Sequence, residues 1–350
     1  MRKLAFILFA ALATIPAFAQ KDAFAGFYKG KITLADGSEL KKGYPFSMYS
    51  ELFAEVYRGP DENYRLRIQP DIMSRAENAA IAENLKASGG KIAFKTSGEI
   101  ALKGEITPDG ITADGTYANQ KIKLDFKRLD FKSPTMGAKA PAGAAVLFDG
   151  ANASDEWVLV ADEKIPFNWI IEEGAMTVKT DALKPDGKRL STSIRTKKAF
   201  GKSKLHIEFR IPPMYDKLGQ ARANSGVFFG PYEVQVLDSF GTEALWNECG
   251  SLYRQTPPQV NACLEPGAWQ TYDIYYTPAK YDGDKLAAYP TFTVYLNGVR
   301  VQNGTEVPYS TSIARKEADK FVHPKTPVQL QLQDHTNPVS FRNIWIEEIK

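Results

Sequence analysis

Histidine and cysteine are scarce in this 350-residue sequence, which has three of the former and two of the latter. So few scattered nitrogen and sulfur ligands do not make a zinc centre. Charge of one sign is also lacking, because the formal net charge is only +3. A chain this close to neutral has no strong field to attract nucleic acid or an anionic membrane. We therefore expect no nucleic-acid partner, and the sequence identifies no protein partner.

Long apolar runs are absent beyond the amino terminus, so we expect no membrane span. The amino terminus itself reads as a signal peptide: Arg2 and Lys3 precede an apolar run, and Ala17-Phe18-Ala19 supplies the small residues of a cleavage site. We expect residues 1–19 to be removed after Ala19 and the mature protein to be periplasmic or secreted. Loss of the two basic residues lowers the net charge to +1.

The two cysteines, Cys249 and Cys263, are expected to form a disulfide, because an exported protein matures in an oxidising compartment. The bridge would close a loop of about 15 residues and contribute about 3 kcal/mol in the chain-entropy model.

The first half of the mature chain predicts a small β-rich accessory domain over residues 22–132. Its strands are short and separated by turn signals such as Pro108-Asp109-Gly110. One helix is expected over residues 71–88, where alanine is frequent and Ser88-Gly89-Gly90 would end it. Residues 133–143, rich in proline, glycine, alanine and lysine, indicate a linker.

Residues 144–350 predict a second domain that is all-β. Short strands with turn signals, and almost no helical periodicity, are typical of a β-sandwich. Asn297-Gly298 marks a tight hairpin between two of the expected strands.

Polar side chains of an unusual kind alternate with apolar ones in three strands of this domain. In residues 232–236, Glu233 and Gln235 alternate with the apolar positions, and residues 328–333 repeat the pattern with three glutamines. In residues 205–211 the polar positions are His206, Glu208 and Arg210. Leu237 breaks the alternation, so Asp238 joins the polar face only if the strand bulges or ends. Amides and carboxylates offer the paired donors and acceptors that sugar hydroxyls need, and the abundant aromatic rings offer flat surfaces for sugar rings. The sequence therefore predicts a carbohydrate substrate.

Several motifs in this domain, taken together in their order along the chain, resemble the 3-keto-disaccharide hydrolase family. They are Leu147-Phe148-Asp149-Gly150, Asn224-Ser225-Gly226-Val227, Tyr232 to Asp238, Cys249 to Tyr253, Pro266 to Trp269, Leu296-Asn297-Gly298, Leu330 to His335 and Phe341 to Ile344. The resemblance implies a concanavalin A-like jelly-roll fold for residues 144–350. It also implies an exported enzyme of a kind common in Bacteroidetes.

The reaction that the resemblance implies is cleavage of glycosides whose C3 hydroxyl has become a ketone. The ketone acidifies the C2 proton, so the aglycone leaves by elimination and water adds back. Such a reaction needs a base for the C2 proton, donors for the enolate oxygen and an acid for the leaving oxygen.

Three residues are candidates for the proton-transfer roles. Glu233 leads the polar face of its strand, although it could instead be a structural carboxylate bound to Arg210 or Arg342. Asp238 is the second candidate, as an acid–base group or metal ligand, with a loop-capping role as the alternative. His335 follows the glutamines and titrates near neutrality, unless it is a structural histidine at a strand end.

Six further residues are candidates for substrate binding, each with a structural alternative such as a hydrogen bond within the sheet or an ion pair. The amides are Asn224, Gln235 and Gln333; Tyr253, with Trp246, would stack on sugar; Arg222 or Arg342 would stabilise an enolate. No cofactor is clearly indicated: the chain offers oxygen ligands for a divalent cation such as calcium, but without a diagnostic spacing.

Two other functions remain open at this point. A laminarinase-like glycoside hydrolase would have a Glu-x-Asp-x-x-Glu pattern where this chain has Glu233, Gln235 and Asp238, so the central carboxylate is missing. A non-catalytic carbohydrate-binding envelope protein would use the same polar face without turnover.

Overall fold

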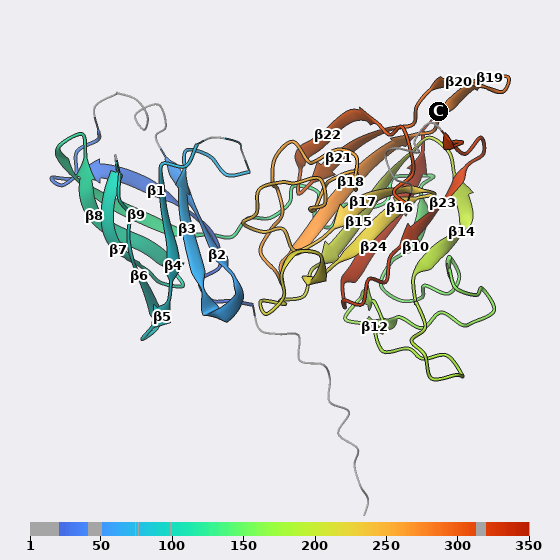
Figure 1. Cartoon of the computed structure of the whole chain (residues 1–350), viewed down its shortest axis with the longest axis horizontal. Helices are drawn as coiled ribbons and strands as arrows, with labels where there is room; N and C mark the ends of the chain where they lie inside the picture. The colour runs from blue at the N-terminus through green and yellow to red at the C-terminus, as the bar shows by residue number, and fades with distance from the viewer. Residues whose placement is uncertain are drawn as a thin grey trace, which may run out of the picture.

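The structure, a computed structural model, describes residues 21–40, 51–73, 75, 77–98, 100–312 and 320–349. This part of the chain folds into two β-rich lobes (Figure 1), and its only helical turns are the short 3-10 segments Pro60–Glu62 and Gly219–Ala221. None of its helices is long and apolar enough to cross a membrane. The predicted signal peptide lies outside the described residues.

The first lobe is an antiparallel sheet of nine strands in the order β4-β3-β2-β1-β9-β8-β7-β6-β5. Its strands are β1 Gly26–Leu34, β2 Leu52–Arg58, β3 Tyr64–Gln69, β4 Ala80–Leu85, β5 Ala87–Ser88, β6 Lys91–Lys95, β7 Ile100–Ile106, β8 Gly110–Tyr117 and β9 Gln120–Leu129. Only Lys86 separates β4, which pairs with β3, from β5, which pairs with β6. This brings β4 beside β6 without a backbone pairing between them, so the lobe is an up-and-down barrel whose seam is closed only at β5.

The interior of the barrel is filled by the alternate, apolar side chains of its strands. Ile92 and Phe94 of β6, and Ile122, Leu124 and Phe126 of β9, are buried in this core. Close packing of the strands requires glycine in places: a Cβ added at Gly30 would lie 2.0 Å from the Asp125 carbonyl oxygen.

The helix predicted over residues 71–88 is wrong. This stretch contains β4 and β5, in which Ala80 and Ala82 are buried in the barrel while Ile81 and Glu83 are exposed. The spacing of the alanines fits the two-residue period of a strand as well as the period of a helix. Pairing with β3 outweighs their intrinsic helix propensity. Gly89 and Gly90, taken as a helix end, form the turn into β6 with φ angles of +57° and +76°.

The second lobe consists of two antiparallel sheets packed face to face, so the predicted all-β sandwich is confirmed. The eight-stranded sheet has the order β12-β13-β24-β15-β18-β21-β22, with β10 paired to β24, and the five-stranded sheet has the order β11-β14-β23-β16-β17. The strands are β10 Ala145–Phe148, β11 Trp157–Leu159, β12 Ile170–Glu172, β13 Ala175–Thr177, β14 Ile194–Phe200, β15 Ser203–Arg210, β16 Ser225–Phe229, β17 Tyr232–Val236, β18 Trp269–Thr277, β21 Thr291–Leu296, β22 Val299–Glu306, β23 Val328–Leu332 and β24 Ser340–Glu348. A small hairpin, β19 Lys280–Asp282 and β20 Lys285–Ala288, projects from this lobe.

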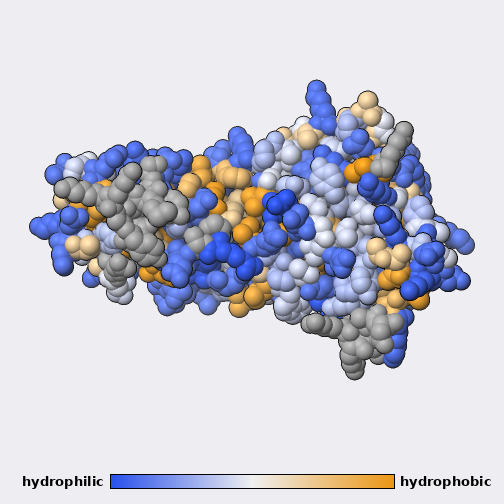
Figure 2. All heavy atoms as spheres, turned by 90° about the horizontal axis from the view of Figure 1, so that it is seen from above, coloured by the Kyte–Doolittle hydropathy of each residue, from blue (hydrophilic) through white to orange (hydrophobic). Residues whose placement is uncertain are grey.

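The two lobes are in contact. A small apolar cluster joins Phe27 of the barrel to Phe240 and Leu264 of the sandwich, and Figure 2 shows apolar side chains where the lobes meet. The rings of Phe27 and Phe240 meet edge to face, with centroids 5.2 Å apart. The barrel is thus packed against the segment that follows β17.

Candidate active site

Polar side chains of β17, β16 and β23 share the outer face of the five-stranded sheet. Tyr232, Val234 and Val236 point into the core of the sandwich, so Glu233 and Gln235 must point outward. The register places Gly226 of β16 opposite Gln235, and the backbone N–H of Gln333 donates to the Gly226 carbonyl. The structure therefore brings Glu233, Gln235 and Gln333 onto one face.

The segment that returns to the other side of β17 widens this face. The Tyr253 N–H donates to the Glu233 carbonyl at 3.1 Å, and the Gln235 N–H donates to the Ser251 carbonyl at 3.0 Å. Leu252 pairs with Val234 and is buried in the core, so Ser251 and Tyr253 point outward beside the polar residues of β17. The half-exposed Trp246 has its ring centroid 5.9 Å from that of Tyr253. An aromatic wall thus flanks Glu233.

Glu233 has the electrostatics of a proton-transfer group. Its side chain is almost buried, and no described residue gives its carboxyl a hydrogen bond or an ion pair. Burial alone raises the pKa of Glu233 to about 8. A carboxyl that titrates close to neutral pH can take up or release a proton during a reaction.

Gly226 makes room for this carboxyl. A Cβ added at Gly226 would lie 2.5 Å from Oε1 of Glu233, so the carboxyl leans across β16 rather than along its own strand. The same residue separates Gln235 from Gln333 in the sheet. The carboxyl therefore points between the two amides. The structural partners considered for Glu233 are absent from this face, because Arg210 and Arg342 belong to the eight-stranded sheet.

A network of amides fixes the side of the site next to Gln235. The buried Asn224 donates from Nδ2 to the carbonyl and Oε1 of Gln220, and Gln235 donates from Nε2 to the same Oε1 at 3.2 Å. Gln220 in turn donates to the Asn247 carbonyl at 2.8 Å. Sequence reasoning missed Gln220, because it lies in a single 3-10 turn where no strand pattern marks a face.

Two buried polar atoms on this face have no hydrogen-bond partner in the described part of the chain: Oε1 of Gln333 and Oγ of Ser251. Such atoms are rare in folded proteins, and a site for a ligand or water explains them. Sequence reasoning missed Ser251 as well, although its spacing of two from Tyr253 is the signal that would place both on one face.

His335 has fewer contacts with the face that carries Glu233 than the other candidate residues there. It lies two residues beyond Gln333, it is exposed, and its imidazole forms no hydrogen bond with the described residues. The residue between them, Asp334, is buried and receives hydrogen bonds from Arg189 and Thr192. His335 is therefore at the rim of the face.

Asp238 and Arg222 do not lie in this site. Their buried side chains form an ion pair with each other. Arg222 also donates to the Tyr57 hydroxyl at 2.7 Å and to the Arg58 carbonyl at 3.1 Å, both in the barrel. Burial raises the pKa of Asp238, and Arg222 opposes that rise. Both groups are satisfied at the junction of the lobes, so neither has the catalytic or substrate-binding position expected from sequence.

Arg342 lies on the opposite sheet from Glu233. It donates from Nε to Glu208 at 2.6 Å, and its guanidinium stacks 3.9 Å from the centroid of Trp269. The segment predicted as a linker covers this cluster, because the Gly137 N–H donates to Glu208 at 2.6 Å. Burial raises the pKa of Glu208, but hydrogen bonds from His206, Asn343, Arg342 and Gly137 outweigh it and hold that pKa at about 2. Arg342 therefore has a structural position.

The two cysteines are free thiols in the structure, so it does not contain the predicted disulfide. Both are buried, and Cys249 lies 3.2 Å from the hydroxyl of Tyr272, which donates to the Gln235 carbonyl at 2.6 Å. Cys263 lies 3.7 Å from the Leu237 carbonyl oxygen, just beyond the end of β17. Both thiols pack directly behind the strand that carries Glu233.

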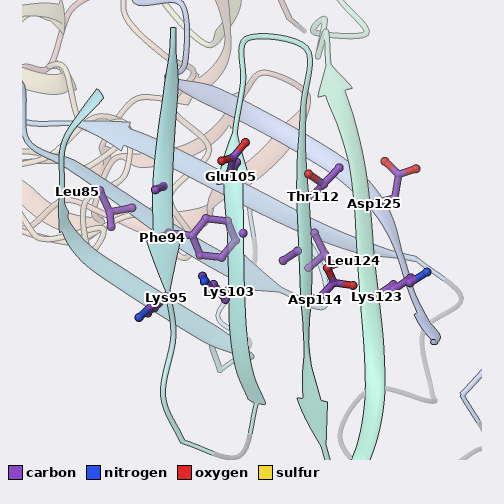
Figure 3. A pocket seen from close by; sticks show the side chains of 13 residues that line it. Leu85, Phe94, Lys95, Lys103, Glu105, Thr112, Asp114, Lys123, Leu124 and Asp125 are labelled. Carbon is purple, nitrogen blue, oxygen red and sulfur yellow. The ribbon is translucent and has the colours of Figure 1, made fainter. Parts of the chain in front are cut away.

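The described residues contain no group of three or more histidine, cysteine, aspartate or glutamate side chains arranged to hold a metal ion. A shallow hollow also lies on the barrel, over β6 to β9 (Figure 3). Its polar lining, including Lys103, Asp114 and Lys123, is exposed and mixed in charge, as is typical of a solvated sheet face.

A buried, unpaired carboxyl beside amides and aromatic rings on the face of a β-sandwich is typical of domains that bind and cleave sugars. Over residues 143–347 the sequence matches the family of 3-keto-alpha-glucoside-1,2-lyase-like domains, and the chain belongs to this family. This confirms the resemblance noted from the motifs.

Two solved structures are similar to this chain. A candidate glycosyl hydrolase from Parabacteroides distasonis is 36% identical, with a TM-score of 0.52, over 60% of this chain and 86% of that one. A second candidate glycosyl hydrolase from the same species is 20% identical, with a TM-score of 0.41, over 59% of this chain and 94% of that one. No curated protein matches the chain. Family and neighbour together indicate an enzyme of the glycoside-cleaving type.

Proposed function

We propose that this protein cleaves 3-keto-glycosides, including 3-keto-disaccharides, with Glu233 as the group that takes the C2 proton. One observation carries the proposal: Glu233 is buried and unpaired among the described residues, and its pKa is raised to about 8. An ordinary surface carboxylate is too weak a base for a carbon acid, whereas a desolvated one is stronger.

The chemistry is an elimination followed by hydration. The ketone at C3 makes the C2 hydrogen acidic, so the Glu233 carboxylate removes it while the electrons form an enolate. The enolate collapses, C1=C2 forms, and the C1–O bond to the aglycone breaks with a proton passing to the leaving oxygen. Water then adds, with its hydroxyl on C1 and a proton on C2. The family description, a 1,2-lyase, supports a double bond between C1 and C2.

The residues around Glu233 have substrate-binding roles in this proposal. Gln333 has a buried amide oxygen that finds no partner among the described residues, and in this proposal that oxygen accepts a hydrogen bond from a sugar hydroxyl. Gln235 and Asn224 are held rigid by Gln220, which favours binding of one sugar orientation. Tyr253 and Trp246 offer aromatic surface for the aglycone.

Two groups are proposed as the acid for the leaving oxygen. Tyr253 lies beside Glu233 and stays protonated, because burial and the Glu233 carboxylate raise its pKa. His335 lies exposed at the rim, and a protonated imidazole can donate a proton to a leaving oxygen. Comparing Tyr253→Phe with His335→Gln on a poor and a good leaving group distinguishes them, since only loss of the acid slows the poor leaving group selectively.

The test is incubation with a 3-keto-glucoside in D2O, followed by NMR of the released sugar. We expect cleavage with deuterium at C2 of the product, and loss of turnover in Glu233→Gln. The matched control is Glu208→Gln, the same change in a buried carboxyl on the other sheet, which should retain turnover.

Each alternative gives a distinct outcome in the same assay. A laminarinase-like hydrolase cleaves the unoxidised glycoside and leaves C2 unlabelled, and a carbohydrate-binding protein binds without turnover; either result refutes the proposal. Binding of Asp238 by Arg222 already disfavours a retaining pair of carboxyls. Export remains a separate proposal, and recovery of mature protein beginning at Gln20 would test it.

A further inference from the structure

The segment between β17 and Ser251 leaves the strand of Glu233 and returns to it; we call residues 237–250 the site loop. Asp238 is its second residue, and at its far end the Gly250 N–H donates to the Gln235 carbonyl at 3.1 Å. It carries Trp246, and its Asn247 carbonyl accepts hydrogen bonds from Gln220 and Gln235. The path of the site loop therefore sets both the aromatic wall and one side of the amide network.

The outer surface of the barrel is hydrogen bonded to this loop, directly or through Arg222, at two points. At its start, the Tyr57 hydroxyl accepts a hydrogen bond from Arg222, which is paired with Asp238. At its turn, Arg65 and Arg67 both donate to the Gly241 carbonyl.

The backbone conformation at Gly241 allows this close contact with the barrel. Gly241 has a φ of +77°, and a Cβ there would lie 2.7 Å from the ring of Tyr57, so only glycine allows the approach. The next residue back, Phe240, packs edge to face on Phe27 of the barrel. Tyr57 therefore contacts the loop through its ring and, through Arg222, by its hydroxyl.

We propose that the barrel is a positioning part of the catalytic site, which holds the site loop through Tyr57 and the Arg222–Asp238 pair. Tyr57 is then a positioning residue for a site in the other lobe. The inference rests on the proposed function where it predicts a change in kcat/KM. Its prediction about the structure of the site loop does not depend on that function.

The physical reason lies in the cost of ordering a loop that has no strand or helix of its own. Each residue that is fixed in one conformation loses backbone entropy, which opposes ordering of the loop. Within the site loop, Asp238, Phe240 and Gly241 are anchored by the barrel directly or through Arg222. Without these anchors, Trp246 and Asn247 would sample positions away from Gln235.

The experiment compares Tyr57→Phe with wild type in the full-length protein. The change removes only the hydroxyl and leaves the ring against Gly241. We expect kcat/KM for a 3-keto-glucoside to fall about tenfold, the effect of losing a hydrogen bond to a charged group. Thr96→Val is the control, because its hydroxyl makes its hydrogen bonds with Ile100 and Leu102 inside the barrel. It should leave kcat/KM unchanged.

A double-mutant cycle with Arg222→Lys tests the route. If Tyr57 acts through Arg222, the double variant loses no more activity than Arg222→Lys alone. Additive losses, or unchanged kcat/KM in Tyr57→Phe, would overturn the proposal.

Limited chymotrypsin digestion supplies a readout that needs no turnover. The bond after Trp246 lies in the site loop on a half-exposed residue. We expect Tyr57→Phe to be cut there several-fold faster than wild type and Thr96→Val to be cut at the wild-type rate. Equal cleavage rates in all three proteins would refute the proposal that the barrel holds the site loop. If wild type fails to cleave any 3-keto-glycoside, the proposed function fails while this digestion still decides the role of the barrel.

Discussion

Replacing Glu233 by glutamine should change the pH dependence of stability in a way that can be calculated. The native carboxyl titrates near pH 8, whereas an ordinary glutamate titrates near 4.5. Between those values the native state holds a proton that the unfolded chain has released. The native state is therefore penalised as pH rises: the penalty is absent below pH 4.5, grows through the neutral range and is complete above pH 8.

The magnitude follows from about 1.4 kcal/mol for each pH unit over which the two states differ by one proton. Between pH 5 and pH 9, wild type should lose about 4 kcal/mol relative to Glu233→Gln, whose side chain does not titrate. Urea unfolding of both proteins at pH 5, 7 and 9 measures this difference. Any fixed effect of the amide cancels, because only the change with pH is compared.

The control is Glu208→Gln, in which the replaced carboxyl has a pKa of about 2. Glu208 is ionised in both the folded and unfolded states from pH 6 upward, so its own titration adds no change between pH 7 and pH 9; any change there comes from His206, whose pKa Glu208 helps to raise. If the difference between wild type and Glu233→Gln is flat from pH 5 to pH 9, Glu233 is not a desolvated carboxyl and its proposed role as the base loses its physical support.

Three further predictions concern the surroundings of Glu233. Gly226→Ala should lower kcat at least tenfold with little change in secondary structure by circular dichroism, because its Cβ would occupy the position of the Glu233 carboxyl; wild-type kcat would contradict the geometry. Trp246→Ala should raise KM several-fold for large aglycones, as expected from about 1 kcal/mol of lost aromatic contact, and an unchanged KM would remove Trp246 from the substrate site. Arg342→Ala should lower the free energy of unfolding by about 2 kcal/mol, because Glu208 loses its cation, while kcat of the folded enzyme is retained; a loss of kcat would restore the substrate-binding role expected from sequence.

The sequence predicted the sandwich and the shared face of Glu233, Gln235 and Gln333 because period-two alternation is a local property that survives tertiary packing. It failed at residues 71–88 for the opposite reason: alanine fits a helix and a buried strand equally well, and the partner strand β3 decides between them. The position of the Asp238–Arg222 pair at the junction of the lobes could not be foreseen, because its partner Tyr57 lies 165 positions from Arg222, in a lobe whose placement no local pattern reveals. Gln220 and Ser251 were missed because their neighbours come from other segments.

The seam of the barrel has a consequence for how this protein can associate. The facing edges of β4 and β6 are not paired with each other, so their backbone groups are open to pairing with another strand. The sandwich has terminal strands as well, including β11 in one sheet and β12 and β22 in the other. Self-assembly through backbone pairing would start from these edges of either lobe.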